Sequence, residues 1–575
     1  MLRSPRRKLF KKFSILVGLA FAGAAGAQDF DRIAPKPVLP PGATPVEGAR
    51  QAPRDTAIRV KALAGIVFLT DSQSVRKEGA APVAGLDVSR VPELQTEAFG
   101  ARMSKYLGRP VSLASIDDLV REVVAYFNDN DRPFVVVVAP EQDITGGILQ
   151  VVVIEGRVGE VRVLGAKTFD ERIYRNAIGL KPGDAILKRR LDADVDFLNR
   201  NPFRDVSLLL EPGKAVGTTD VTLRTRERAP LRLYAGFDDT GIDETDNQRL
   251  LFGVNWGNVF GLDHQLSYQY TASPDFDTFR AHSATYFAPL PWRHFVTVFG
   301  SYADTKSRVP APFALDGNSR QLGLRYEIPL EKIRGYSHSV IAGLDYKRTN
   351  NNLEFGLTNV SATSAEIFQG VLSYQGNLGD LSGTTSFTGT IFYSPGGLSG
   401  KNKDINFQAL RAFAESEYVY GNMQLQRITR LPREFSWHFS AEAQIADGNL
   451  LGSEQLGAGG YASVRGYDER QANGDQGYLI RNELRTPAFS LGAPLPGKEA
   501  QLQLLAFLDY GMVRNKRLLP GEDRSVELAS AGLGSRLSID QNVSARFDYG
   551  WQLKDSGIPG GPRNSRAHFS LLVSY

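Results

Sequence analysis

The sequence contains no cysteine among its 575 residues, and it has only six histidines and four tryptophans. The absence of cysteine excludes disulfide scaffolds, thiol catalysis, thiolate metal sites and iron–sulfur clusters together. We therefore expect the fold to be held by packing and hydrogen bonds. The length would suggest about four domains at roughly 150 residues each, although large barrels depart from that rule.

The sequence also has no apolar run of the roughly 20 residues that a transmembrane helix needs. The mostly apolar stretch Phe13–Ala22 follows six basic residues without an acid, and it precedes small residues that end at Ala27. This layout predicts a secretory signal peptide over residues 1–27, cleaved after Ala27, in preference to a membrane-anchoring helix.

A surplus of positive charge is missing once this segment is set aside. The whole chain carries 67 Lys and Arg against 63 Asp and Glu, a net charge of +4. Without the six basic residues of the signal, 61 basic residues oppose 63 acidic ones, which gives a net charge of −2. This near balance does not indicate a nucleic-acid-binding surface.

Residues 28–56 form a proline-rich N-terminal segment, with six prolines between Pro35 and Pro53. Proline lacks a backbone donor and clashes with the preceding turn of a helix, so this segment cannot form one continuous helix. We expect a flexible linker or plug ahead of the first domain.

Two small α/β repeats follow, over residues 57–156 and 157–227. The clearest element is a helix over residues 116–128, because its apolar residues share one face, and Ser115 with Asp118 predicts a capping box at its start. Each repeat is expected to run strand, helix, helix, strand, strand, and an edge strand could accept an extended peptide. The expected strands are 57–68, 134–139, 147–154, 158–164, 206–210 and 220–225, and the expected helices are 93–107, 116–128, 170–178 and 187–198.

Residues 228–575 differ in composition and pattern. All four Trp, all six His and 18 of the 21 Tyr lie here. Many segments alternate with period two, for example 231–238, 250–256 and 265–270, and turn dipeptides such as Asp316-Gly317 separate them. One face of each segment is apolar or aromatic and the other is small or polar, and no helical period appears. The region is therefore predicted to consist of β-strands.

A soluble β-sandwich would show the same alternation. The predicted signal peptide, a length too great for one sandwich, and aromatic residues at segment ends favour a membrane barrel instead. A closed antiparallel barrel satisfies every backbone polar group within lipid, which an open sheet cannot do. At roughly 22 residues per strand and connection, the region holds about sixteen strands. The predicted fold is an all-β transmembrane barrel of about sixteen antiparallel strands, preceded by two α+β domains.

Two short strings mark a candidate functional site. Val464, Arg465, Gly466 and Tyr467 form a V-R-G-Y string in a glycine-rich, polar stretch, where an arginine would by default be solvated. Phe507, Asp509 and Gly511 form an F-x-D-x-G string on a later apolar strand, with Asp509 on the opposite face to Leu508. At the chain end, Phe569, Leu571, Val573 and Tyr575 alternate outward. That last pattern resembles the C-terminal assembly signature of bacterial outer-membrane barrels, which usually ends in Phe.

With the tandem repeats before them, these strings resemble the two-partner secretion transporter family (TpsB), of the haemolysin secretion and activation type. That family lies within the superfamily of POTRA-bearing outer-membrane barrels. The resemblance extends over nearly the whole chain after the signal. It includes Pro140-Glu141-Gln142-Asp143, Glu155-Gly156, Leu198-Asn199, Asn201-Pro202 and Arg481-Asn482-Glu483-Leu484.

The resemblance implies a first POTRA domain over residues 57–156, a second over 157–227 and a sixteen-stranded barrel over 228–575. The POTRA domains would lie in the periplasm and the barrel in the outer membrane. In that family the V-R-G-Y loop folds back into the barrel lumen, which implies an ion pair between Arg465 and Asp509. Relatives often carry an N-terminal helix that plugs the pore, and the prolines of residues 28–56 argue against a long helix here.

The implied function is recognition of a partner exoprotein by the POTRA domains and its secretion, with activation in the haemolysin type, through the barrel without nucleotide hydrolysis. The partner would be a large secreted protein with an N-terminal secretion domain, of adhesin or cytolysin type. Other implied partners are the lipid bilayer and the outer-membrane assembly machinery that inserts the chain itself. An assembly factor for other outer-membrane proteins is the alternative, although such factors usually have more than two POTRA repeats, and a passive porin would not explain the repeats.

Enzyme function is not indicated. The sequence has neither G-x-S-x-G nor H-E-x-x-H, and Ser74 with Lys77 matches S-x-x-K without its companion strings. Gly400-Lys401 lacks both the upstream glycine of a P-loop and the following Ser or Thr. We therefore predict no catalytic residue, metal site, cofactor or nucleotide motor.

Overall fold

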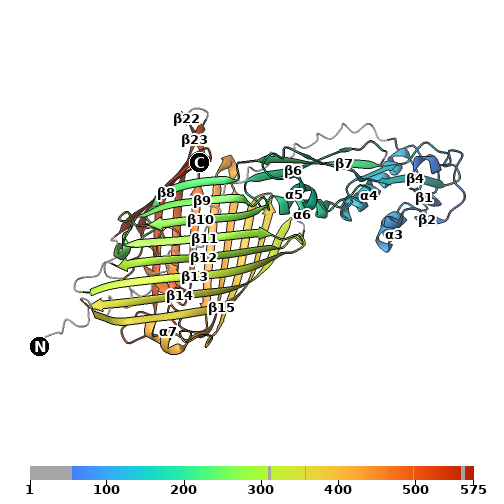
Figure 1. Ribbon diagram of the computed structural model, residues 1–575. Coiled ribbons are helices and arrows are strands. Elements are labelled where there is room, and N and C mark those ends of the chain that lie inside the picture. The colour runs from blue at the N-terminus through green and yellow to red at the C-terminus, as the bar shows by residue number, and fades with distance from the viewer. Residues whose placement is uncertain are drawn as a thin grey trace. The chain divides into compact units, whose positions relative to one another are not determined.

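The computed structural model describes residues 55–575 except 216, 308–312, 334, 356–357, 496–497 and 558–563. The predicted signal peptide, its cleavage site at Ala27 and nearly all of the proline-rich segment lie outside these residues. The described part divides into two compact units, which meet in sequence between Arg228 and Ala229. The first unit contains two α/β domains and the second is a barrel (Figure 1).

The first α/β domain is built on a four-stranded sheet in the order β2-β1-β4-β3, in which β1 runs parallel to both neighbours and β3 antiparallel to β4. The expected strand over 57–68 forms only from Gly65, and the three-residue strand β2 was not expected. Its described elements are β1 (Gly65–Leu69), η2 (Ser72–Ser74), β2 (Gly85–Asp87), η3 (Pro92–Leu94), α3 (Glu97–Ser104), α4 (Leu113–Asp129), β3 (Val135–Val138) and β4 (Ile148–Glu155).

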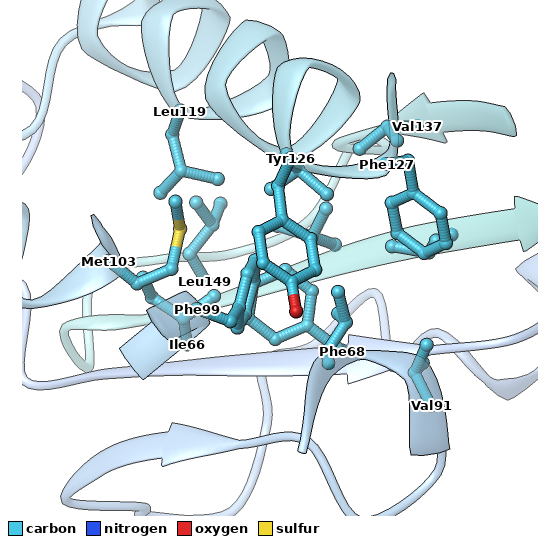
Figure 2. Packing of buried hydrophobic residues seen from close by; sticks show 14 of the residues in the cluster. Ile66, Phe68, Val91, Phe99, Met103, Leu119, Tyr126, Phe127, Val137 and Leu149 are labelled. Carbon is cyan, nitrogen blue, oxygen red and sulfur yellow. The ribbon is translucent and has the colours of Figure 1, made fainter. Parts of the chain in front are cut away.

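Helix α4 covers the sheet with its apolar face, and Leu119 and Phe127 point into the core (Figure 2). Phe99 from α3 meets the ring of Tyr126 edge to face, with ring centroids 4.9 Å apart. The predicted capping box was wrong by one turn. Ser112, not Ser115, is the N-cap: its hydroxyl accepts from the backbone of Ser115, whose hydroxyl accepts from the backbone of Ser112.

The second α/β domain has the expected order of strand, helix, helix, strand, strand. Its sheet order is β5-β7-β6, with β5 parallel and β6 antiparallel to β7. Tyr174, Leu198 and Leu223 lie in its buried core. The elements are β5 (Arg157–Leu164), α5 (Glu171–Ala177), α6 (Lys188–Leu198), β6 (Arg204–Pro212) and β7 (Thr218–Glu227).

The second unit is a closed antiparallel barrel. Both β21 and β22 pair with β23, so they form two parts of one wall position, and the described strands occupy sixteen positions. The wall strands are β8 (Leu231–Asp238), β9 (Arg249–Val259), β10 (His264–Ala272), β11 (Phe279–Pro289), β12 (Phe295–Ser307), β13 (Phe313–Pro329), β14 (Tyr336–Phe355), β15 (Thr358–Asp380), β16 (Gly383–Pro395), β17 (Glu417–Arg430), β18 (Ser436–Ala446), β21 (Gln476–Arg485), β22 (Phe489–Leu495), β23 (Lys498–Arg514), β24 (Ser525–Ile539), β25 (Val543–Gln552) and β26 (Ser565–Ser574).

Closure of the barrel depends on the pairing of β26 with β8, where the backbone groups of Tyr575 and Leu233 exchange hydrogen bonds of 2.8 and 3.0 Å. Side chains alternate along the wall as expected: on β23, Asp509 is fully buried and Leu508 is exposed. On the outer face of β26, Phe569 and Val573 are exposed and Leu571 is half-buried, and Tyr575, which follows the strand, is exposed. The predicted fold class is therefore confirmed.

One helix in the barrel unit was not expected from the sequence. Helix α7 (Asp404–Leu410) follows β16, and Phe407 packs into a cluster with Ile367 and Tyr418. Its seven residues are too few to establish a helical period. No helix among the described residues has both the length and the apolar content to cross a membrane.

A carboxylate in the second domain provides a test of the fold. Oxygen Oε2 of Glu227 accepts hydrogen bonds from the backbone of Lys167 at 2.8 Å and Thr168 at 2.5 Å, and Oε1 accepts one from the Tyr174 hydroxyl at 2.5 Å. Burial opposes the charged form, but the hydrogen bonds outweigh it, so the pKa of Glu227 is below its usual 4.5. Such a group stabilises the fold above its unfolded pKa, and the contribution is lost as the pH falls through the folded pKa.

We therefore expect Glu227→Gln to speed hydrogen exchange of residues 167–177 relative to the wild type at pH 7, with the difference narrowing below about pH 4. The matched control is Glu141→Gln, which alters an exposed carboxylate of the same unit. Equal exchange in the two variants at pH 7 would contradict the assigned role of Glu227.

Candidate functional site

A long loop, residues 447–475 between β18 and β21, lies inside the barrel, and we call it the lumenal loop. It includes the short hairpin of β19 (Leu456–Ala458) and β20 (Ala472–Gly474). The loop contacts inward-facing side chains of strands as far apart as β14 and β26. A segment that reaches both of these strands from their inner faces must occupy the lumen.

The side chain of Arg465 is the centre of these contacts and has no exposed surface. Its Nε and Nη2 donate to the two carboxylate oxygens of Asp509 at 2.7 and 2.8 Å, which is the forked geometry that guanidinium offers to a carboxylate. Its Nη1 donates to Glu483 Oε1 at 2.6 Å and lies 3.7 Å from Asp548 Oδ2. The structure thus brings the V-R-G-Y arginine onto the aspartate of the F-x-D-x-G string.

The three carboxylates come from inward positions on three wall strands, of which β21 and β23 are adjacent and β25 follows after β24. Asp509 lies on β23, Glu483 on β21 and Asp548 on β25. The Phe507 ring, two residues before Asp509 on the same face, packs under the guanidinium with its centroid 3.6 Å from Cζ of Arg465. Further inward arginines balance the acids: Arg485 donates to Glu483 at 2.5 and 2.9 Å, and Arg536 pairs with Asp548 at 2.7 Å.

The glycines of both strings allow this close approach. Gly466 has φ +88°, a left-handed conformation that favours glycine, and a Cβ there would lie 2.9 Å from the carbonyl oxygen of Gly550 on β25. Its backbone N–H donates to Nε2 of His568 at 3.1 Å. Across the wall, a Cβ at Gly511 would lie 2.9 Å from Cγ2 of Val464. The lumenal loop therefore comes into close contact with the wall at the glycine of each motif, Gly466 and Gly511.

The hydroxyl of Tyr467 anchors the next position of the loop. It donates to the carbonyl oxygen of Ala529 on β24 at 2.9 Å, and its ring is fully buried beside Val464 in the cluster with Leu528. Each residue of the V-R-G-Y string thus contacts the wall in its own way. Val464 packs against apolar side chains, Arg465 pairs with carboxylates, Gly466 donates a backbone hydrogen bond, and Tyr467 donates one from its hydroxyl.

A second attachment holds the loop to another part of the wall. The fully buried Glu454 accepts from Lys347 Nζ on β14 at 2.8 and 3.0 Å, and from the Tyr420 hydroxyl on β17 at 2.8 Å. At the base of the loop, Asp475 pairs with Arg411 and accepts from the backbone of Leu450 at 2.9 Å. The loop is therefore tied by charged side chains both to the wall and to the connection between β16 and β17, in which Arg411 lies.

Several of these residues had no role in the sequence-based prediction. Glu483 was part of a quoted string only, whereas Asp548, His568, Glu454 and Lys347 were not singled out. Inward position in an alternating strand would have marked Glu483, Asp548 and Lys347 as lumen residues. Apart from the Arg465–Asp509 pair that the family resemblance implies, no sequence signal identifies which of the inward charges meet, because the pairings depend on how the loop folds. The exposed outer-face residues of β26 are not part of this site.

A closed barrel preceded by two α/β domains, with a lumenal loop tied to its wall by an arginine, defines a POTRA-bearing outer-membrane transporter. The family model "Haemolysin secretion/activation protein ShlB/FhaC/HecB" matches residues 217–537, the model "POTRA domain, ShlB-type" matches 81–156, and the POTRA model "Surface antigen variable number repeat" matches 156–228. The chain belongs to the haemolysin secretion/activation protein family. It is a two-partner secretion transporter of the outer membrane, with its POTRA domains in the periplasm.

Curated relatives cover most of the chain at low identity. The heme/hemopexin transporter protein HuxB of Haemophilus influenzae is 24% identical over 78% of this chain and 79% of its own length. The hemolysin transporter protein ShlB of Serratia marcescens is 25% identical over 85% of each. Among solved structures, CdiB from Escherichia coli superposes with a TM-score of 0.76 at 19% identity, covering 100% of this chain and 99% of that one. The predicted family and location are confirmed.

The left-handed glycine of the loop gives one prediction. Gly466→Ala would place a methyl group against Gly550 in a conformation that costs an L-residue about 1–3 kcal/mol. We expect the loop to shift from the wall and the purified protein to open more often in planar-bilayer conductance recordings. Gly448→Ala is the control, because a Cβ at that position of the same loop meets nothing within 4 Å. Equal opening frequencies in the two variants would refute the explanation that the glycine at position 466 lets the loop lie against the wall.

The second attachment gives another prediction. Lys347→Met would leave Glu454 buried without its cation, at a cost of about 3–5 kcal/mol. We expect faster hydrogen exchange in residues 447–475 of that variant. The exchanged pair Lys347→Glu with Glu454→Lys should recover part of the protection, because opposite charges face each other again. An exchanged pair no better protected than the single variant would contradict a direct charge interaction.

Proposed function

We propose that the chain exports a large partner exoprotein through the barrel lumen, and that the lumenal loop held by Arg465 controls this path. The observation that carries the proposal is the position of Arg465: a fully buried cation pairs the loop with carboxylates on three strands of the wall. A loop tied inside the lumen occupies space that an exported chain must pass.

Charged contacts suit a loop that has to move. When an apolar plug leaves its site, it exposes hydrophobic surface to water, which is unfavourable. When Arg465 and Asp509 separate in a wet lumen, each group regains the hydration that it lost on burial. The ion pair therefore fixes the position of the loop when it is bound. Displacement of the loop costs less free energy than displacement of an apolar plug would.

Capture of the partner is assigned to the sheet edges of the POTRA domains. Strand β3 is an edge of the first sheet, and its Val136 is 57% exposed and Val138 40% exposed. An extended segment can add to such an edge through backbone hydrogen bonds, with exposed valines providing apolar contacts. The partner class is a large exoprotein with an N-terminal secretion domain, of adhesin or cytolysin type.

Export without a nucleotide motor requires another source of free energy. A segment that folds after it reaches the cell surface can no longer slide back, so folding outside favours net export. We assign the activation named in the family description to the same event, as acquisition of the exoprotein's fold after passage.

An assembly factor for other barrel proteins is the alternative function, and the two POTRA matches together with the family model favour secretion.

The outer face of β26 is proposed to direct insertion of the chain itself. Phe569, Leu571, Val573 and Tyr575 all lie on that face, and Tyr575 is 95% exposed. This row of apolar side chains on the last strand could be recognised by the outer-membrane assembly machinery before the barrel closes. The proline-rich residues 28–56 remain assigned as a linker or plug.

Substitution of the loop arginine tests the proposed path. We expect Arg465→Ala to insert as a heat-modifiable barrel but to lower the partner protein in the culture medium by about tenfold or more, because three carboxylates lose their shared cation. Arg465→Lys should be intermediate, since an ammonium keeps the charge without the fork. The control is Arg433→Ala, which removes an exposed arginine from the turn between β17 and β18. Normal export by Arg465→Ala would refute the proposed role.

A further inference from the structure

An outward-facing cluster of arginines lies on the barrel wall, away from the lumenal loop. The end of the barrel at which β8 begins faces the periplasm, because β8 follows the periplasmic domains after three residues. By alternation of the strands, the last residues of β12 and β14 and the first residues of β11 and β13 face the cell exterior. These four strands are consecutive neighbours in the wall (Figure 1).

Three arginines lie at this outer end on the lipid-facing side: Arg280 on β11, Arg320 on β13 and Arg348 on β14. The side is set by alternation, since Leu322 is 56% exposed and Leu344 63% exposed on the same faces, whereas Asp345 is buried toward the lumen. Arg320 and Arg348 are directly opposite each other in the β13–β14 register. Like charges in directly opposed positions are unfavourable unless an anion lies between them.

The chain neutralises this cluster only in part. Within the described residues, neither Arg280 nor Arg320 makes a side-chain hydrogen bond or ion pair, and Nε of Arg348 is buried without a hydrogen-bond partner. Two acids lie directly opposite members of the cluster, Asp304 opposite Arg280 and Glu366 opposite Arg348, whereas Arg320 has no acid opposite it. Both acids are also engaged by hydroxyl groups. Asp304 accepts from the Tyr302 hydroxyl at 2.6 Å, and Glu366 accepts from Ser399 at 2.6 Å and lies 4.0 Å from Arg348.

The surroundings of the arginines are amphipathic. Toward the middle of the membrane, the outward positions are Leu322 and Leu324 on β13 and Tyr346 and Leu344 on β14, with Leu322 opposite Tyr346 and Leu324 opposite Leu344 in the register. Tyr302 is opposite Arg320 on one side of the cluster. A ligand that fits this surface has acyl chains that cover the leucines and anionic groups that reach the arginines.

We propose that this cluster binds the phosphate groups of a phosphorylated glycolipid in the outer leaflet of the outer membrane. Guanidinium groups bind phosphate through paired N–H donors, and two adjacent arginines can share one phosphate or hold two. The acyl chains of the same molecule lie against the leucines below. The phosphate supplies the counter-charge that Arg320 lacks within the chain, which explains why Arg320 and Arg348 are tolerated in opposed positions.

The test uses the full-length protein purified in detergent, with a deep-rough lipopolysaccharide that retains its lipid A phosphates as the probe. The comparison ligands are the same glycolipid after enzymatic removal of its phosphates, and inorganic phosphate alone. The variant is Arg320→Gln with Arg348→Gln. Its matched control is Arg430→Gln with Arg433→Gln, which removes two exposed arginines at the periplasmic end of the wall. Heat-modifiable migration verifies that each barrel is closed.

We expect the wild type and the control to bind the phosphorylated glycolipid about tenfold more tightly than the dephosphorylated one, and the Arg320 and Arg348 variant to lose this preference. Equal binding of the two glycolipids by the wild type would overturn the proposal. So would a double variant that keeps the preference, or saturation of the site by inorganic phosphate without a preference for the glycolipid. These outcomes do not depend on export, so failure here is distinguishable from failure of the proposed secretion path.

Discussion

A fully buried guanidinium requires carboxylates that meet it inside the protein, and the position of the lumenal loop depends on this constraint. The acids that meet Arg465 come from β21, β23 and β25, so they coincide in space only when these strands are in their correct register. A slip of one residue would turn Asp509 toward lipid and Leu508 toward the lumen. The arrangement of the loop and the arrangement of the wall are therefore specified together.

The small residues of the two motifs have a matching explanation. Gly511 leaves space for Val464, and Gly466 lies against Gly550, so the loop backbone approaches the wall more closely than side chains would allow. The short distance brings the Arg465 side chain to Asp509 in a forked geometry. The motifs are thus the two sides of one contact, although 40 residues or more separate them in sequence.

The sequence was most informative where a pattern repeats. Period-two alternation over residues 228–575 was sufficient to predict β-strands with one apolar face. The predicted signal peptide, the length of the region and the aromatic residues at segment ends then favoured a barrel of about sixteen strands over a sandwich. Short elements were harder to predict: β2 has three residues and α7 seven, and neither is long enough to show a period. The cap of α4 was misplaced because Ser112 and Ser115 are both acceptable N-cap residues. Contacts such as Glu454 with Lys347 depend on how an irregular loop folds, which no local pattern encodes.

The seam between β26 and β8 has a consequence for the order of folding. Every other neighbouring pair in the wall joins strands that are close in sequence, whereas Arg232 and Ser574, which share a hydrogen bond at this seam, are 342 residues apart. Hairpins from β8 onward can form as the chain becomes available, but β8 keeps one edge unpaired until β26 arrives. A chain cut short before residue 565 would remain an open sheet with two free edges. Barrel closure therefore distinguishes chains that include β26 from shorter fragments. Only chains that include β26 have no unpaired strand edge facing lipid.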